Sequence, residues 1–303
     1  MEGMQTSRSG IEIKGLKTTW ALLCSIRWRE VLILQGAPFM GIAFSMGKLT
    51  IHKLPAIAVF GIAGFLLVAH IWSLNDWSDM HADQGDANKT ARVFSSKGID
   101  RSTMLWFSIT LLAASLGLFA LLGLQTLLIA ISIALYGFLY SFSGINAKGI
   151  PLLSSVTHFI GGLFHFLLGY TLFAGIDRNA VLIAVFFAVI FTSGHAVQEV
   201  QDHEADNRRG VRTNAVVFGK RTVFMAALIG FSFAYCYLIC LSLFAIVPAQ
   251  LGWLCLILFP LHLFKAQRTA RKGLAFENIS RFRGFYRFLF ALIGLNMVLM
   301  LFL

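Results

Sequence analysis

Apolar stretches long enough to cross a membrane recur along almost the whole chain. A spanning helix needs about 20 predominantly apolar residues, and most of the uninterrupted apolar windows of this sequence approach that length. Charged residues gather between the windows rather than inside them. We therefore predict about nine transmembrane helices, over residues 29–47, 54–75, 103–122, 124–142, 153–174, 180–201, 222–246, 248–264 and 285–303.

The composition of the 303 residues agrees with this pattern. Hydrophobic residues make up 57% and charged residues 13%, and the mean hydropathy of +0.76 is far above that of soluble domains. No linker or low-complexity tract divides the chain. The sequence predicts an all-α, polytopic membrane protein with one transmembrane domain over residues 1–303. Residues 1–28 form a basic lead-in without a cleavable signal, suited to the cytoplasm or the headgroup region.

The net charge of +11 would suit a nucleic-acid partner, but the placement of the charges argues against one. With nine helices and a cytoplasmic amino terminus, all but three of the 25 Lys and Arg lie on one side of the membrane. The exceptions are Lys48, Lys53 and Arg178. Basic short loops face the cytoplasm. We expect the basic side to face the cytoplasm and its last loop to contact membrane lipid headgroups.

A polar motif ends the second apolar window. Asn75, Asp79 and Asp83 stand at i, i+4 and i+8, so on a helix their side chains share one face. These oxygen donors suit a hard cation such as Mg²⁺. Acids at the end of a membrane segment are candidates for function.

A second copy of the motif ends the sixth window, displaced by 123 residues. Gln198, Asp202 and Asp206 have the same spacing as the first set. The residue after the amide is also an acid in both copies, Asp76 and Glu199. Both motifs fall on the predicted cytoplasmic side, so we interpret them as two halves of one site.

Carboxylates brought together from two helix ends repel one another unless cations lie between them. Magnesium takes one or two protein carboxylates and completes its octahedron with water and phosphate oxygens, so two ions could hold one diphosphate. The cytoplasmic loops supply cations that could stabilise a leaving phosphate, and the aromatic-rich helices suit an isoprenoid chain. A cation transporter is the alternative from a different class. Transporter sites usually lie near the bilayer midplane, whereas these acids lead directly into basic loops.

The two motifs resemble the Asp-rich motifs of the UbiA superfamily of intramembrane prenyltransferases. The similarity covers nearly the whole chain, and nine helices with both motifs on the cytoplasmic side agree with it. The segment after the second motif is similar to the Gly-x-x-Thr…Gly continuation of the family. The matching residues are Asn75-Asp-x-x-Asp79-x-x-x-Asp83, Asp202-x-x-x-Asp206, Gly210-Val-Arg-Thr213 and Phe218-Gly219.

The resemblance implies roles for particular residues. Two Mg²⁺ ions bridging a prenyl diphosphate would be held by Asn75, Asp79, Asp83, Asp202 and Asp206, with Gln198 as a weaker or water-mediated ligand. Arg92 stands in the position of the family's loop arginine, although the prolines of that loop are missing here. Tyr140 and Lys148 resemble a Tyr-Ser…Lys loop, and Arg27 or Arg29 resembles the arginine at the start of the first helix. The residues expected to act on the diphosphate are Asp79, Arg92, Lys148 and Asp202, with Arg27, Asn75 and Tyr140 binding it.

The implied reaction is the Mg²⁺-dependent transfer of a prenyl group from an allylic prenyl diphosphate to an aromatic or lipophilic acceptor in the membrane. A membrane terpene cyclase keeps the same ionisation but closes the cation on itself, and it is the alternative closest to this reaction. Phosphoribosyl transfer to a lipid phosphate is a further chemistry of the family. The sequence carries no readable motif for the acceptor.

Overall fold

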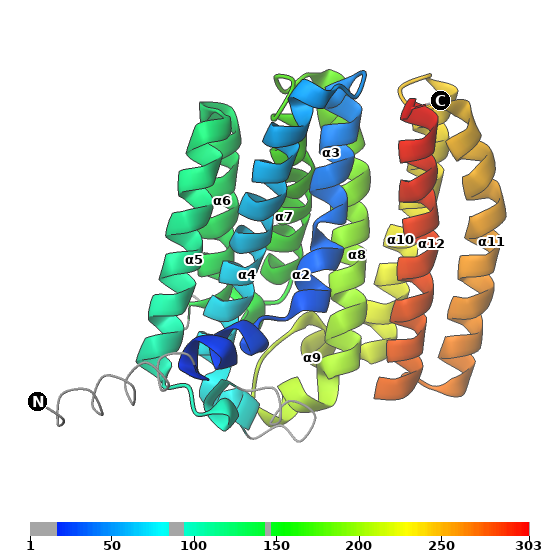
Figure 1. Ribbon diagram of the computed structural model, residues 1–303. Coiled ribbons are helices and arrows are strands. Elements are labelled where there is room, and N and C mark those ends of the chain that lie inside the picture. The colour runs from blue at the N-terminus through cyan, green and yellow to red at the C-terminus, as the bar shows by residue number, and fades with distance from the viewer. Residues whose placement is uncertain (1–16, 85–93, 143–146, 303) are drawn as a thin grey trace, which may run out of the picture.

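A computed structural model describes residues 17–84, 94–142 and 147–302, and this part of the chain is helical without strands (Figure 1). Residues 17–25 form a first helix, α1, ahead of the bundle. The other α-helices are α2 (Trp28–Leu34), α3 (Gly36–Met46), α4 (Leu54–Gln84), α5 (Arg101–Leu122), α6 (Leu124–Ser141), α7 (Leu153–Tyr170), α8 (Arg178–Arg208), α9 (Asn214–Phe218), α10 (Lys220–Leu243), α11 (Ala249–Lys272) and α12 (Phe276–Phe302). Short 3-10 turns lie at Ile51–Lys53, Phe94–Lys97 and Ala147–Gly149.

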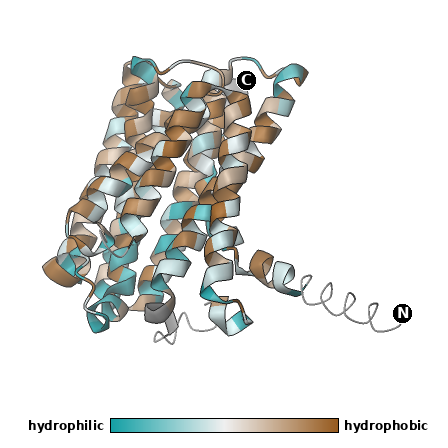
Figure 2. Cartoon of the chain, turned by 90° about the vertical axis from the view of Figure 1, so that its left-hand side faces the viewer, coloured by the Kyte–Doolittle hydropathy of each residue, from teal (hydrophilic) through white to brown (hydrophobic). Residues whose placement is uncertain are grey.

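Seven of the described helices are long and apolar enough to cross a membrane, namely α4, α5, α6, α8, α10, α11 and α12. The predicted all-helical, polytopic membrane protein is thereby confirmed, whereas the count of nine stays a prediction. The first predicted window is divided between α2 and α3, and the fifth corresponds to α7, where two histidines lower the hydropathy. Figure 2 shows apolar residues along the middle of the helices and hydrophilic residues gathered toward one end.

The helices α4 and α8 carry the two polar motifs and contain 31 residues each. At 1.5 Å per residue such a helix is about 46 Å long, which exceeds the hydrocarbon thickness of about 30 Å. The extra turns carry the motifs out of the apolar core without ending the helix. This length explains how acidic side chains remain on a regular helical face while they reach water and the basic loops.

The break between α2 and α3 occurs at Gln35, which is buried. Its side-chain amide donates to the carbonyl oxygen of Val31 at 3.2 Å and to that of Gly64 on α4 at 3.3 Å. A glutamine can satisfy carbonyls in this way because its NH₂ group has two donors. The break is therefore tied to the helix that carries the first motif.

The helices α3 and α7 cross with their backbones almost in contact. A Cβ added to Gly169 would lie 1.8 Å from the carbonyl oxygen of Pro38, and one added to Gly41 would lie 2.1 Å from that of Phe166. Small residues allow membrane helices to approach this closely. The crossing fixes α7, which forms one wall of the site, against the amino-terminal helices.

The start of α5 is capped by Asp100 outside the membrane span. Its carboxylate accepts from the hydroxyl of Thr103 at 2.5 Å and from the Thr103 amide at 2.9 Å. These bonds hold the pKa of Asp100 below its ordinary value. The cap stabilises the helix above the carboxyl's unfolded pKa, and this contribution is lost as the pH falls through the lowered folded pKa.

Candidate active site

A cavity of about 740 Å³ opens between the helices, and both polar motifs line it. Its walls come from α2, α3, α4, α6, α7, α8 and α12. The polar end holds the motif residues, whereas the remaining lining is largely aromatic and aliphatic. Apolar lining residues include Ile33, Met40, Phe186, Phe187, Ile190, Phe191, Phe290 and Leu295. A ligand with a charged head and a long apolar chain matches this division.

The first motif presents Asn75 and Asp79 to the cavity, as the helical spacing predicted. The ammonium group of Lys148 forms an ion pair with Asp79. Ser78 Oγ donates to the carbonyl oxygen of Ser141 at 2.6 Å, which fixes the end of α6 beside the motif. The predicted acid and the predicted phosphate-binding lysine therefore lie together, although 69 residues separate them.

The acid beside Asn75 has a different role. Asp76 pairs with the guanidinium of Arg27, whose Nε donates to Asp76 Oδ2 at 3.3 Å. The guanidinium also lies over the ring of Trp72, 4.7 Å from its centroid. Arg27 lines the cavity and Arg29 does not, so the structure favours Arg27 of the two predicted candidates.

The second motif also lines the cavity, with Gln198, Asp202 and Asp206, and Arg209 follows them. The Gln198 amide oxygen accepts a long hydrogen bond of 3.4 Å from Arg283 Nη2. Arg283 donates more closely, at 2.7 Å, to Gln201 Oε1. Gln198 is therefore partly engaged by α12, and its role as the weaker metal ligand stays a prediction.

Two predicted residues lie outside what the structure describes. Arg92 falls in the 85–93 segment, and Asp83 belongs to α4 but its side chain is not described. Their roles stay predictions.

The oxygen donors of the site fit a Mg²⁺ ion that is held partly by the protein and partly by the phosphate of its substrate. Carboxylate and amide oxygens from two helices, Asn75, Asp79, Asp202 and Asp206, line the same cavity. Among the side chains that the structure describes, no three acids, histidines or cysteines are close enough to form a metal cage. Mg²⁺ commonly takes one or two protein carboxylates and leaves its other positions to water and phosphate, so an open arrangement of this kind suits it.

The environment of Glu199 differs from that of Asp76, the acid at the same position of the first motif. It is only 3% exposed, and its Oε1 accepts from Ser154 Oγ at 2.9 Å and from Asn214 Nδ2 at 3.1 Å. His195 Nε2 lies 3.0 Å from the same oxygen. Sequence reasoning did not assign this group to the site, although His195-x-x-x-Glu199 has the i, i+4 spacing that brings side chains together on a helix.

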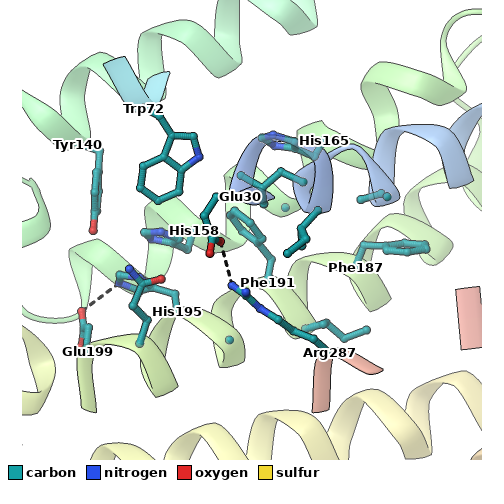
Figure 3. A pocket seen from close by; sticks show the side chains of 18 of the residues that line it. Glu30, Trp72, Tyr140, His158, His165, Phe187, Phe191, His195, Glu199 and Arg287 are labelled. Carbon is teal, nitrogen blue, oxygen red and sulfur yellow. Dashed lines mark hydrogen bonds and ion pairs between the residues drawn. The ribbon is translucent and has the colours of Figure 1, made fainter. Parts of the chain in front are cut away.

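Aromatic rings and imidazoles form the wall beyond the motifs. The rings of His158 and His195 are stacked, with centroids 3.4 Å apart and planes inclined by 8°. Tyr140 meets His158 edge-on at 5.0 Å. Figure 3 shows these three side chains together with Glu199 at one side of the pocket. Tyr140 therefore lines the cavity next to two histidines that were not predicted to belong to the site, and its binding of diphosphate stays a prediction.

An ion pair of Glu30 and Arg287 lies at the other side of the pocket (Figure 3). Arg287 Nη2 is 3.2 Å from Glu30 Oε2, and both side chains are about one-third exposed. The pair connects α2 with α12 across 257 residues of sequence. No local pattern could have predicted it, because the two partners belong to helices at opposite ends of the sequence.

Comparisons with known proteins find similarity to prenyltransferases along most of the chain. The model of the UbiA prenyltransferase family matches residues 37–292. A digeranylgeranylglyceryl phosphate synthase of Thermococcus gammatolerans is 24% identical over 234 residues, covering 72% of this chain and 79% of that protein. Its counterpart in Pyrococcus abyssi is 24% identical over 280 residues, covering 86% of this chain and 95% of that protein.

Solved structures show the same fold. A UbiA homolog from Archaeoglobus fulgidus bound to GPP and Mg²⁺ superposes with a TM-score of 0.70 at 15% identity, covering 92% of this chain and 99% of that one. A digeranylgeranylglyceryl phosphate synthase structure gives a TM-score of 0.70 at 20% identity, covering 93% and 98%.

The match over residues 37–292, the shared fold and the motifs on α4 and α8 confirm the predicted resemblance and class of enzyme. The chain belongs to the UbiA prenyltransferase family.

Proposed function

We propose that the protein transfers a prenyl group from an allylic prenyl diphosphate to a lipophilic acceptor, with Mg²⁺ as cofactor. The observation that carries this proposal is the shared cavity, with Asp79, Lys148 and Asp202 at its polar end and an apolar wall beyond them. Diphosphate and isoprenoid chain have the same division of polarity. The archaeal homolog bound to GPP and Mg²⁺ supports the choice of donor class.

Asn75, Asp79, Asp202 and Asp206, with Asp83 and the weaker Gln198, would hold two magnesium ions. The bound ions supply positive charge that neutralises the departing diphosphate. Lys148 and Arg209 line the same end, and with Arg27 and Arg92 they would bind non-bridging phosphate oxygens. Such cations stabilise charge that develops on a leaving group.

The apolar wall would bind the prenyl chain and exclude water from the allylic carbon. Phe187 and Phe191 lie in this wall, and the edge of Tyr140 faces His158. Aromatic faces attract cations, so these rings favour the positive charge that develops as diphosphate leaves. Because the polar end lies where the basic loops meet, we propose that the diphosphate enters from the cytoplasm.

For the acceptor we propose a lipid that carries a phosphate. The names of the two archaeal relatives indicate a prenylated glyceryl phosphate product. In this chain Arg287 also lines the cavity, on the other side from Glu199 and His195 (Figure 3), where it could bind an anionic group. An aromatic acceptor is the second candidate, because the stacked His158 and His195 offer a flat surface to a ring.

The test is a product assay on the purified protein in lipid nanodiscs. Geranylgeranyl diphosphate and Mg²⁺ are supplied with geranylgeranylglyceryl phosphate, with 4-hydroxybenzoate, or with no acceptor, and products are identified by mass. We expect a Mg²⁺-dependent adduct with the glyceryl phosphate lipid. A cyclic hydrocarbon or alcohol from the donor alone would favour the terpene cyclase. Competition by a phosphoribosyl diphosphate donor would favour phosphoribosyl transfer.

The site is tested by Asp79→Ala and Asp202→Ala, with Glu277→Ala as the matched control at the exposed start of α12. The first two should abolish Mg²⁺-dependent diphosphate release, and the control should retain it. Full activity in both site variants, or in excess chelator, would contradict the proposal. Magnesium-driven ion flux without any diphosphate release would favour a transporter.

A further inference from the structure

One acidic group of the cavity is unsuited to metal binding. Glu199 is buried, and its Oε1 already accepts from Ser154 and Asn214. Asn214 is itself fixed, because its Oδ1 accepts from the Leu152 amide at 2.7 Å. Glu199 Oε2 is buried without a partner among the described residues. The carboxylate is therefore rigid, and its negative charge is only partly offset by hydrogen-bond donors.

The group that faces this carboxylate is His195. Its Nε2 lies 3.0 Å from Glu199 Oε1 in an ion-pair contact without hydrogen-bond alignment, and the neighbouring carboxylate favours a proton on Nε2 and a lone pair on Nδ1. A buried, partly unpaired carboxylate also stabilises an imidazolium formed beside it, as in the hydrolase triads. The pair has the parts of a base and its orienting acid.

The Nδ1 atom distinguishes His195 from the other two imidazoles of the cavity. His158 Nδ1 bonds to the Ser154 carbonyl oxygen at 2.7 Å, and His165 Nδ1 bonds to that of Gly161 at 2.9 Å. Both therefore carry their proton on Nδ1. His195 Nδ1 has no partner in the part of the chain that the structure describes, and the residue lines the cavity. His158 and His165 keep a lone pair on Nε2, but of these three imidazoles His195 is the one for which the described contacts include a carboxylate against the other ring nitrogen.

The position along α8 suits such a role. His195, Glu199, Asp202 and Asp206 stand at i, i+4, i+7 and i+11, so they share one face, and all four line the cavity. Seven residues place His195 roughly 10 Å from Asp202 along the helix axis, toward the membrane interior. A diphosphate at the level of Asp202, with its chain in the apolar part, has its allylic carbon on the His195 side.

We propose that His195, oriented by Glu199, accepts the proton that the acceptor loses when it is prenylated. This inference rests on the proposed transfer reaction. The bond between the allylic carbon and the diphosphate oxygen breaks, and its electron pair leaves with diphosphate. The acceptor atom bonds to the allylic carbon, and its proton passes to His195 Nδ1. After product release the imidazolium returns this proton to water at the polar end.

The experiment measures two outputs separately in nanodiscs: diphosphate released from geranylgeranyl diphosphate, and prenylated acceptor. The acceptor probe is whichever of geranylgeranylglyceryl phosphate and 4-hydroxybenzoate the unmodified protein prenylates. His195→Ala should lower transfer about 100-fold, within the usual range for losing a general base. Diphosphate release should change by less than about threefold, because the ionising residues are intact. The donor carbon should then appear mainly as the prenyl alcohol.

Chemical rescue separates a proton acceptor from a structural side chain. Imidazole at millimolar concentration should restore transfer in His195→Ala, because the variant leaves a ring-sized space in the cavity wall. His165→Ala is the matched control, since it removes another cavity imidazole whose Nδ1 is already bonded. It should show neither a shift from adduct to alcohol nor rescue. Glu199→Gln should shift the products in the same direction as His195→Ala, but less.

Several outcomes would overturn the inference. One is an unchanged ratio of adduct to alcohol in His195→Ala, and another is a parallel loss of diphosphate release and transfer. If His195→Ala does not yield monodisperse protein, His195→Gln is measured in its place with the same expected shift to alcohol. An unmodified protein that prenylates neither probe would contradict the proposed function instead.

Discussion

Lys148 contacts a predicted metal ligand and is proposed to bind the departing diphosphate. Its ammonium pairs with Asp79 and lines the cavity, so it can move to a phosphate oxygen without leaving the site. Lys148→Ala should lower kcat about 10²-fold, the usual effect of removing one donor to a leaving group. Lys148→Arg should lose less, because the charge remains. Initial rates of diphosphate release at saturating Mg²⁺ measure both.

Lys97→Ala is the control for Lys148. Its ammonium donates to the carbonyl oxygen of Cys24 at 2.7 Å on the same side of the bundle, but Lys97 does not line the cavity. This variant should keep the normal rate. A similar loss in both variants would mean that the effect comes from surface charge and not from a contact with diphosphate.

Asn214 contributes to stability as well as to the rigidity of Glu199. It joins three elements, because it donates to Ser154 on α7 and Glu199 on α8 from its own place in α9. Asn214→Ala leaves buried groups without partners, which costs about 1–3 kcal/mol. We expect a lower midpoint of thermal unfolding in detergent. Asn278→Ala, which removes hydrogen bonds at the surface of α12, should lower it less.

Residue roles could be predicted from the sequence only where they depend on helical spacing. Asn75, Asp79 and Asp202 reach the cavity because i, i+4 spacing fixes the face they share. The contrast between Asp76, paired with Arg27, and Glu199, enclosed by Ser154 and Asn214, depends on which helix lies opposite. That choice is made by tertiary packing, so the equal spacing of the two motifs could not reveal it.

At the scale of helices, the crossing of α3 and α7 makes a sharp prediction. Gly169→Ala introduces a Cβ 1.8 Å from the Pro38 carbonyl oxygen, and backbone atoms cannot give way as a flexible side chain can. We expect the two helices to move apart, which should lower the free energy of unfolding by about 1–3 kcal/mol. Thermal unfolding in detergent and the yield of monodisperse protein report the effect.

Gly161 on the same helix supplies the control. A Cβ added there has its nearest neighbour at 3.8 Å, an atom of the Phe191 ring, which is ordinary contact. Gly161→Ala should therefore unfold at nearly the normal temperature. Equal stability of the two alanine variants would argue against the close backbone crossing.

Two features of the helices explain why the number of membrane spans is hard to predict from hydropathy. The first apolar window reads as one helix, yet Gln35 hydrogen-bonds to Val31 and Gly64 and the helix breaks there. In α7, His158 and His165 reduce the hydropathy although both line a cavity and do not face lipid. Hydropathy along the sequence cannot distinguish these polar residues from those of a loop. The long α4 and α8 are predicted well because their apolar and polar parts are continuous.

At the scale of the whole molecule, α2 near the amino terminus and α12 at the carboxyl terminus are joined by the ion pair of Glu30 and Arg287. Arg287→Gln should raise the KM for a phosphate-bearing acceptor about tenfold, equivalent to about 1.4 kcal/mol of binding. It should leave the KM for the prenyl diphosphate nearly unchanged, because the diphosphate of the donor is proposed to bind at the polar motifs on α4 and α8. Glu30→Gln should lower the acceptor KM, since it removes a competing anion. A donor KM that rises in step with the acceptor KM would contradict this division.

Orientation in the membrane is also a property of the whole molecule. The three basic residues excluded from the predicted cytoplasmic side lie at helix starts or loops opposite the motifs. Lys53 Nζ bonds to the Lys48 carbonyl oxygen at 3.1 Å, and its ammonium lies 5.4 Å from the centre of the Phe173 ring. Arg178 begins α8, whose other end carries Asp202 and Asp206. The charge asymmetry seen in sequence is therefore an asymmetry between the two ends of the bundle, and it favours a cytoplasmic site.

The two ends of α11 allow this orientation to be measured without touching the site. Gln250 and Lys272 are both exposed and lie at opposite ends of one spanning helix. In a variant whose four natural cysteines are replaced by serine, Gln250→Cys should react with a membrane-impermeant maleimide in intact cells. Lys272→Cys should react only after permeabilisation, because it lies at the basic end with Arg271. The reverse labelling would place the motifs outside the cytoplasm and would require the diphosphate donor to be supplied from that side.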